Sequence, residues 1–196
     1  VLDGLREGAE HCSHDYNKTY TSSEILSNGS AASYEILATI SSSSGPVGLT
    51  FAASPDGSER THVFYNPANS TILVDRSTSS AIKEFGNSTV TGYFHPYTLA
   101  STKALEKITF HVIVDGSLVE IFVNERFALS TRVYPSQTCS TGYGVYVGEG
   151  GEAVVESLQA WVGLKNVWPE RPLDSSSKLV WDTPEQTNNY TWWSGN

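Results

Sequence analysis

The stretch KITFHVIVDGSLVEIFVN, residues 107–124, decides the fold. On each side of Asp115-Gly116, apolar side chains occupy every second position, as expected for a strand with one buried face. These apolar positions are Ile108, Phe110, Val112 and Val114 before the break, and Val119, Ile121 and Val123 after it. Asp-Gly is a frequent hairpin turn. The stretch therefore predicts two adjacent antiparallel strands, each with an apolar face.

Similar short runs, rich in β-branched and aromatic residues, recur on both sides of this hairpin. A second turn signal, Ser54-Pro55-Asp56-Gly57, separates two of them. No long stretch shows an apolar period of 3.6 residues with helix caps. We therefore expect an all-β fold, a concanavalin-like β-sandwich of two antiparallel sheets. The expected strands cover residues 33–40, 47–53, 61–66, 71–75, 108–115, 118–124, 128–134, 143–147 and 154–162.

The chain of 196 residues has the length of one domain with tails. Residues 1–32 show little periodicity and are expected to form an irregular linker, with a short helical turn near Leu2–Leu5. The sandwich is expected over 33–168. Residues 169–196 match neither strand nor helix and are expected to wrap over a sheet, because free tails seldom expose so many tryptophans, here Trp181, Trp192 and Trp193.

The excess of acidic over basic residues argues against polyanionic partners. Acidic residues outnumber basic ones by 21 to 12, and the net charge is −9. Such a chain would repel nucleic-acid phosphates and anionic lipid. Long polar stretches also argue against a membrane span. We expect neither nucleic acid nor membrane as a partner.

Several features are typical of a secreted glycoprotein. Asparagine opens an N-x-Ser/Thr triplet at five positions, and the alternative is that these triplets are accidental in a Ser/Thr-rich chain. The two cysteines, Cys12 and Cys139, could form one disulfide in an oxidising compartment, or either could pair with another chain. No signal peptide opens the sequence, so we expect a mature, trimmed or partial polypeptide. The five triplets start at Asn17, Asn28, Asn69, Asn87 and Asn189.

The residues suggest no catalytic or metal site of their own. Asp115 and Glu120 are a carboxylate pair of the kind glycosidases use, but a turn and its returning strand need not bring their side chains together. No G-x-S-x-G motif marks a nucleophilic serine. The cluster His11, His14 and Asp15 has no third nitrogen ligand nearby, which favours a surface linker over a metal centre.

The tryptophans are the remaining candidates for residues that bind a ligand. Sugars stack on aromatic faces through their apolar C–H patches, so exposed tryptophans on a sandwich would suit carbohydrate binding. The alternative, which we favour, is that they pack in the core and at interfaces. The five tryptophans are Trp161, Trp168, Trp181, Trp192 and Trp193.

The run from Phe110 to Asn124, followed by Ser130-Thr131-Arg132-Val133-Tyr134-Pro135, resembles the V-D-x-S-x-V-E-x-F-x-N and T-x-R-x-Y-P signature of the C-terminal sandwich in glycoside hydrolase family 32. This family includes invertases, inulinases, levanases and fructosyltransferases. The resemblance extends over about residues 33–168. Its further matches are Ser33-Tyr34-Glu35-Ile36, Ser54-Pro55-Asp56-Gly57, Val74-Asp75-Arg76-Ser77, Leu158-Gln159-Ala160-Trp161 and Leu164-Lys165-Asn166-Val167-Trp168.

The resemblance implies a supporting role. In this family the chemistry lies in an N-terminal five-bladed propeller with N-D-P-N-G, R-D-P and E-C motifs, and this chain contains none of the three. Val1–Arg6 looks like the linker that leaves the propeller. The chain alone is therefore expected to be inactive, with the catalytic propeller in the same precursor or in a separate chain. The family's carboxylate chemistry needs no cofactor and no metal.

The expected function is thus to support the propeller of a secreted β-fructofuranosidase-type enzyme that hydrolyses or transfers β-fructofuranosyl units from sucrose or fructans. In some members of the family the sandwich also helps to form dimers, so a homo-oligomer is a second expected partner. Asn124, Arg132 and Tyr134 are candidates for contact with the propeller or a subunit, by position only. The rival function is a carbohydrate-binding module or lectin-like sandwich that binds oligosaccharide without cleavage.

Overall fold

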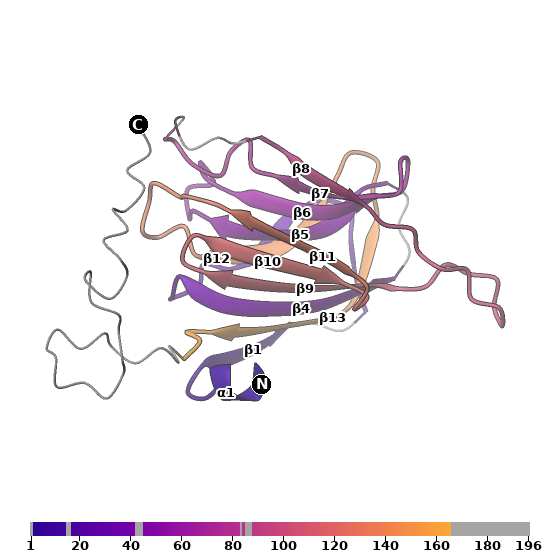
Figure 1. Ribbon diagram of the computed structural model, residues 1–196, viewed down its shortest axis with the longest axis horizontal. Helices are drawn as coiled ribbons and strands as arrows, with labels where there is room; N and C mark the ends of the chain where they lie inside the picture. Colours follow the sequence, from indigo (N-terminus) through magenta and orange to yellow (C-terminus); the bar gives the residue numbers. More distant parts are fainter. Residues whose placement is uncertain (1, 15–16, 42–44, 83, 85–87, 166–196) are drawn as a thin grey trace, which may run out of the picture. The chain divides into compact units, whose positions relative to one another are not determined.

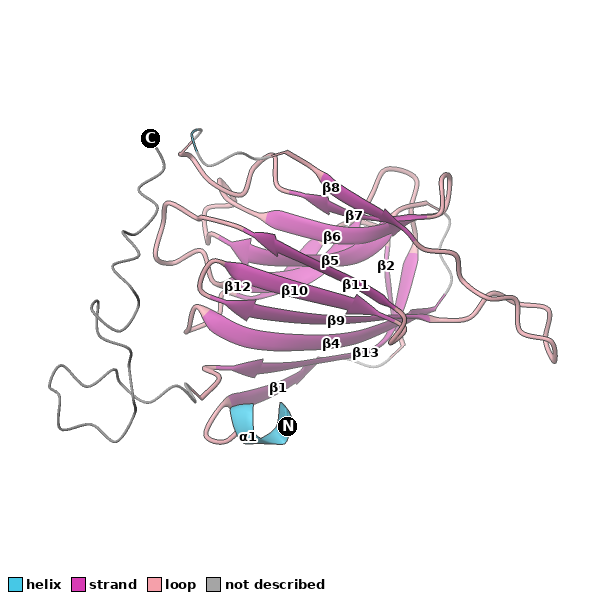
Figure 2. Ribbon diagram, in the orientation of Figure 1, coloured by secondary structure: helices cyan, strands magenta, loops and turns pink. Residues whose placement is uncertain are grey.

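The computed structural model describes residues 2–14, 17–41, 45–82, 84 and 88–165. These residues form thirteen strands and one short helix (Figures 1 and 2). The elements are α1 Leu2–Leu5, β1 Glu10–His14, β2 Lys18–Tyr20, β3 Glu24–Ser27, β4 Ser33–Ser41, β5 Val47–Ala53, β6 Thr61–Asn66, β7 Thr71–Asp75, β8 Val90–Tyr93, β9 Ile108–Asp115, β10 Leu118–Val123, β11 Phe127–Arg132, β12 Gly142–Val147 and β13 Ala153–Val162.

The strands form two antiparallel sheets. The seven-stranded sheet has the order β1-β13-β4-β9-β10-β11, with β2 also pairing with β13, and the six-stranded sheet has the order β3-β12-β5-β6-β7-β8. The two sheets enclose one apolar core, which confirms the predicted β-sandwich. Within the described part of the chain, no helix is long and apolar enough to cross a membrane.

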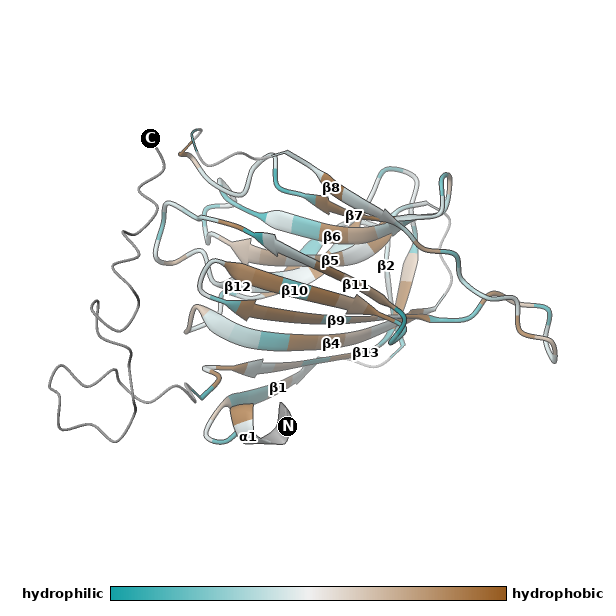
Figure 3. Cartoon of the chain, viewed as in Figure 1, coloured by the Kyte–Doolittle hydropathy of each residue, from teal (hydrophilic) through white to brown (hydrophobic). Residues whose placement is uncertain are grey.

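The predicted hairpin is formed by β9 and β10. Val119 lies opposite Val114 and Ile121 lies opposite Val112, and all four side chains are buried. Gly116 has a φ of 56°, the left-handed conformation that the turn requires and that glycine adopts without strain. Figure 3 shows hydrophobic residues concentrated along these two strands and polar residues in the turns.

The core is built from alternate residues of both sheets. Its largest fully buried side chains come from β4, β5, β9 and β12, so facing strands interdigitate across the sandwich. Removing this apolar surface from water is the main stabilising contribution. The bulkiest of these side chains are Tyr34, Phe51, Phe110 and Tyr143.

All nine predicted strands are present, with ends that shift by at most two residues. The helical turn at Leu2–Leu5 is also confirmed. The prediction that residues 1–32 are irregular was wrong, because β1, β2 and β3 lie in this segment and extend both sheets. These strands are three to five residues long and have exposed faces, so their sequences carry no alternating signal, and it is pairing with β13 and β12 that orders them.

The strand β8 was also missed, since it is four residues long with only intermediate or exposed positions. The segment that follows it, residues 94–107, extends away from the strands at the right of Figure 1 before it enters β9. Tyr97, Leu99 and Leu105 are exposed on this segment. The predicted tail, 169–196, and the predicted end of the sandwich at 168 lie outside the described residues.

Candidate functional site

Several of the stretches that carry the family resemblance meet at one end of the sandwich, here called the motif end. It comprises the turn 54–57, residues 74–77 at the end of β7, the β9–β10 turn at 116–117 and residues 132–141 from the end of β11 onward. The Arg76 guanidinium donates to the Arg132 carbonyl at 2.8 Å, and the Arg132 guanidinium donates to Ser117 Oγ at 2.8 Å. Segments that are far apart in sequence are thus connected by hydrogen bonds.

A buried carboxylate, Glu59, organises the motif end. The residue is 1% exposed, and five donors converge on its two oxygens. Burial by itself would raise the pKa of Glu59, but these hydrogen bonds favour the charged form and lower the pKa to about 2. The donors are Ser136 N and Oγ and Ala81 N to Oε1, and Gln137 N and Ser140 Oγ to Oε2, at 2.5–3.2 Å.

Glu59 also fixes the neighbouring turn. Its backbone N–H donates to Ser54 Oγ at 2.9 Å, and its carbonyl accepts the backbone N–H of Ser54 at 2.9 Å. Asp56 in the same turn accepts hydrogen bonds from Ser54 and Ser58, which lower its pKa to about 2. The loops of the motif end are therefore held in a defined arrangement by charge-assisted hydrogen bonds.

A pocket of about 350 Å³ opens between the sheets at the motif end. Its walls include the apolar side chains of Val114, Val133 and Pro135, and Ser117 lies at the turn that borders it. Two of its residues, Tyr134 and Ile82, expose 36% and 39% of their surface. Apolar side chains around a concave surface are typical of a site that contacts a ligand or another protein surface.

The three predicted contact residues do not come together. Arg132 and Tyr134 lie at the motif end, where Tyr134 lines the pocket. Asn124 lies at the other end of β10, in the turn before β11. Whether any of the three contacts a partner remains a prediction.

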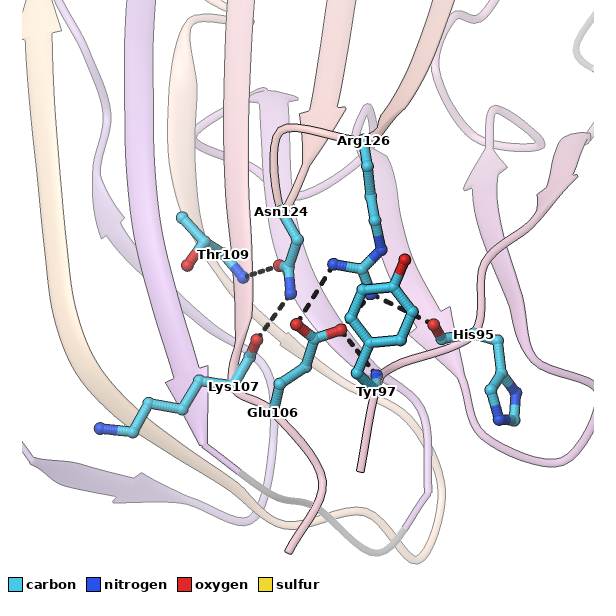
Figure 4. A network of polar contacts seen from close by, with 7 residues as sticks. All are labelled: His95, Tyr97, Glu106, Lys107, Thr109, Asn124 and Arg126. Atoms are coloured by element: carbon cyan, nitrogen blue, oxygen red, sulfur yellow. Dashed lines mark hydrogen bonds and ion pairs between the residues drawn. The ribbon is translucent and has the colours of Figure 1, made fainter. Parts of the chain in front are cut away.

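Asn124 closes its own turn (Figure 4). Its amide oxygen accepts the backbone N–H of Thr109 at 2.7 Å, and its amide nitrogen donates to the Lys107 carbonyl at 2.9 Å. Asn124 also has a φ of 48°, which asparagine tolerates better than most residues. Its side chain therefore has a structural task, whatever contacts the turn makes.

The neighbouring Arg126 anchors the segment 94–107. Its guanidinium pairs with Glu106, donates to the His95 carbonyl at 3.2 Å, and lies 4.0 Å from the centre of the Tyr97 ring (Figure 4). Glu106 in turn accepts the backbone N–H of Tyr97 at 2.7 Å. One arginine thus connects both ends of the extended segment to the sandwich.

Replacing Arg126 with alanine should loosen this segment while the sandwich stays folded. Because the ion pair is largely at the surface, we expect the free energy of unfolding to fall by less than about 1 kcal/mol. Amide hydrogen exchange within 94–107 should accelerate clearly, whereas exchange in β9 and β10 should not. Lys107→Ala, which removes an exposed pair with Glu156, is the control. Unchanged exchange in 94–107 would contradict the anchoring role.

A second polar cluster fixes the N-terminal segment to the outer face of the seven-stranded sheet. Arg6 donates to both carboxylate oxygens of Glu35 at 2.7 and 2.8 Å, and His111 Nε2 lies 2.6 Å from Glu35 Oε1. The Arg6 guanidinium also lies 3.8 Å from the centre of the Trp161 ring. Glu35 is 1% exposed although it points away from the core, because these side chains cover it.

This cluster gives stability a defined pH dependence. Burial would raise the pKa of Glu35, but Arg6 and His111 outweigh it and lower the pKa from 4.5 to about 2. A carboxylate with a depressed pKa contributes stability that is complete above pH 4.5 and is lost as the pH falls towards 2. We therefore expect the free energy of unfolding, measured by urea titration, to fall across this window.

The variant Arg6→Leu should lose about 2 kcal/mol at neutral pH and show a shallower decline on acidification, because Glu35 would no longer have its strongest partner. Lys18→Leu is the control, since its pair with Glu24 is exposed and Glu24 has no comparable burial. If the free energy of unfolding of Arg6→Leu fell as steeply with decreasing pH as that of the unchanged chain, the cluster would not be the cause of the pH dependence.

The remaining predicted residues are placed as follows. Cys12 and Cys139 are free thiols in this structure, so the possible disulfide between them is not formed here. Cys12 lies on β1 opposite Ala160, whereas Cys139 lies in the loop before β12, where its thiol donates to Gln137. Asn17, Asn28 and Asn69 are exposed, and Asn87 and Asn189 lie outside the described residues.

Among the described residues, no group of three His, Cys, Asp or Glu side chains could hold a metal ion. His11 stacks on Trp161 at 4.9 Å between ring centres, and His14 Nε2 lies 3.3 Å from the Tyr143 hydroxyl. Asp15 is not among the described residues. Asp115 lies at the end of β9, opposite Leu118, whereas Glu120 lies opposite Ile113.

Comparison with known proteins identifies the family. Residues 2–162 match the family model described as "Glycosyl hydrolases family 32 C terminal". A levanase of Bacillus subtilis (strain 168) is 31% identical over 171 residues, which cover 85% of this chain and 24% of the levanase.

Two similar solved structures support this. A fructosyltransferase from A. japonicus matches with a TM-score of 0.77 and 25% identity, over 87% of this chain and 29% of that chain. A beta-fructofuranosidase of Aspergillus kawachii, complexed with glycerol, matches with a TM-score of 0.75 and 27% identity, over 87% of this chain and 30% of that chain. The chain thus spans less than a third of the length of these relatives.

Proposed function

The chain belongs to the family of glycosyl hydrolase family 32 C-terminal domains, and from this we propose that it is the non-catalytic sandwich that supports a catalytic β-propeller. The propeller lies in the same precursor or in a separate chain. The whole enzyme hydrolyses or transfers β-fructofuranosyl units of sucrose or fructans. The observation that carries the proposal is the match over residues 2–162, together with relatives of which this chain covers less than a third.

The motif end is the proposed contact with the propeller. Its loops are fixed in advance by Glu59, so docking costs little conformational entropy. Tyr134 and Ile82 offer partly exposed apolar surface there, and the Arg76–Arg132 pair provides polar anchoring beside them. A contact with an apolar centre and a polar rim is the usual composition of a stable interface.

The Arg6–Glu35 pair is a second feature that supports the role of holding the propeller. It fixes Arg6, the last residue of the segment 1–6 that resembles the linker from the propeller, to the seven-stranded sheet. A linker held in this way restricts the positions that a preceding domain can adopt. The sandwich would then act by orienting the propeller and by burying one of its surfaces.

We also propose that the protein is secreted and carries glycans. The three described triplet asparagines, Asn17, Asn28 and Asn69, are exposed, as glycosylation requires. Mass spectrometry of the protein from a eukaryotic secreting host, before and after enzymatic deglycosylation, is the direct measurement. A mass equal to that of the bare polypeptide would contradict this part of the proposal.

Copurification tests the main proposal. An affinity-tagged copy of the chain, isolated under native conditions from its source, should bring down a polypeptide with the N-D-P-N-G motif, or should be found continuous with one. Arg76→Ala combined with Tyr134→Ala should weaken the association if the motif end is the contact. Sedimentation of the isolated chain tests the further possibility of a homo-oligomer, which would sediment faster than a monomer.

A further inference from the structure

The outer face of the six-stranded sheet carries a row of aromatic side chains. Tyr146 on β12 and Phe64 on β6 lie on either side of Gly48 on β5, in one register row. Because Gly48 has no side chain, the two rings meet above it, with 4.7 Å between their centres and 28° between their planes. His62, two residues before Phe64, lies 4.5 Å from the Tyr146 ring. The three rings form an aromatic floor.

A hydrogen bond fixes His62 in this floor. Its Nδ1 lies 2.9 Å from Thr50 Oγ1, and Thr50 is 1% exposed. Burial, with a smaller contribution from the nearby Arg60, lowers the pKa of His62 to about 4. The imidazole is therefore neutral at neutral pH and presents Nε2 as a polar group next to the aromatic rings.

A cavity of about 280 Å³ lies against two rings of this floor, those of His62 and Tyr146, and its volume is near the lower end of the range of small-molecule sites, about 300–1,000 Å³. Tyr146, His62 and Thr50 line it from the sheet, and the segment Ser23–Ile25 forms another wall. Arg60 and Gly57 contribute from the turn between β5 and β6. It shares no lining residue with the pocket at the motif end.

The lining favours a neutral, hydroxyl-rich ligand. Glu24 and Arg60 place one negative and one positive side chain at the cavity, and Asp75 adds a negative charge near His62. This balance gives no attraction for a phosphate or another anion. Aromatic rings beside hydroxyl and imidazole groups match a sugar, which has apolar C–H faces and hydroxyls at its edges.

We propose that this cavity binds one sugar unit of a neutral oligosaccharide, with the ring packed on Tyr146 and its hydroxyls bonded to His62 and Arg60. The proposal does not depend on the catalytic partner, because all its groups belong to this chain. It would give the sandwich a carbohydrate-holding role in addition to its supporting one.

The test uses the full chain labelled with ¹⁵N and three probes: a short fructo-oligosaccharide, a malto-oligosaccharide and a manno-oligosaccharide. We expect at least one probe to cause saturable amide shifts at millimolar concentration, clustered on Thr50, His62 and Tyr146. Ile25→Trp, at a cavity residue that is 44% exposed, should fill the space and weaken binding by about tenfold or more.

Ile82→Trp is the matched control, since Ile82 is similarly exposed but lines the other pocket, and it should leave the affinity unchanged. Tyr146→Phe keeps the ring on which the sugar is proposed to pack, and it should retain binding. The proposal is overturned if no probe shifts these amides in the folded chain. It is equally overturned if Ile25→Trp, shown to be folded by circular dichroism, binds as tightly as the unchanged protein.

Discussion

Replacing Glu59 with glutamine is expected to lower the free energy of unfolding by about 3 kcal/mol. The charged carboxylate accepts five hydrogen bonds, and an amide can accept at only one of its two ends. Donors such as Gln137 N and Ser140 Oγ would then face an NH₂ group in a buried place. Urea unfolding at neutral pH, followed by circular dichroism, measures the loss.

The same substitution should weaken the contact that we propose for the motif end, because Glu59 holds residues 136–140 in place. Glu149→Gln, at an exposed glutamate before β13, is the matched control and should change stability by less than about 0.5 kcal/mol. If Glu59→Gln lowered the free energy of unfolding no more than this control does, Glu59 could not be the residue that holds the loops of the motif end in place.

Replacing Gly48 with alanine should be at least as damaging, with a loss of about 3 kcal/mol or more. A Cβ at this position would overlap the Val63 carbonyl oxygen and the Cα of Phe64 on the neighbouring strand. Both atoms belong to the backbone, so β5 and β6 would have to separate locally. The buried side chains of these two strands would then lose packing contacts in the core.

Gly4→Ala is the matched control, because a Cβ there would meet nothing within 4 Å. Within the helical turn α1 this change should be neutral or slightly stabilising. Thermal unfolding of the two variants side by side tests the prediction. A midpoint for Gly48→Ala equal to that of Gly4→Ala would contradict the close approach of β5 and β6.

The sequence predicted the strands that bury an alternating apolar face. The β9–β10 hairpin is the clearest case, since its alternation and its Asp-Gly turn both point to the same structure. The same logic could not find β1–β3 or β8, because their positions are largely exposed and their order comes from pairing partners that are distant in sequence.

The sites were less predictable than the strands. Glu59 follows a turn and looks like an ordinary surface carboxylate, and only the meeting of three loops makes it buried. Phe64 and Tyr146 come from different strands and lie on the outer face, across Gly48 from each other. Such juxtapositions depend on register between strands, which single-strand patterns do not contain.

We propose that this chain supports sugar cleavage without performing it. Fructose release from sucrose and levan should be measured for the purified 196-residue chain, alone and together with the polypeptide that carries the N-D-P-N-G motif. We predict no release by the chain alone, and release by the combination at higher temperatures than by the partner alone. Fructose released by the purified chain alone would contradict the account.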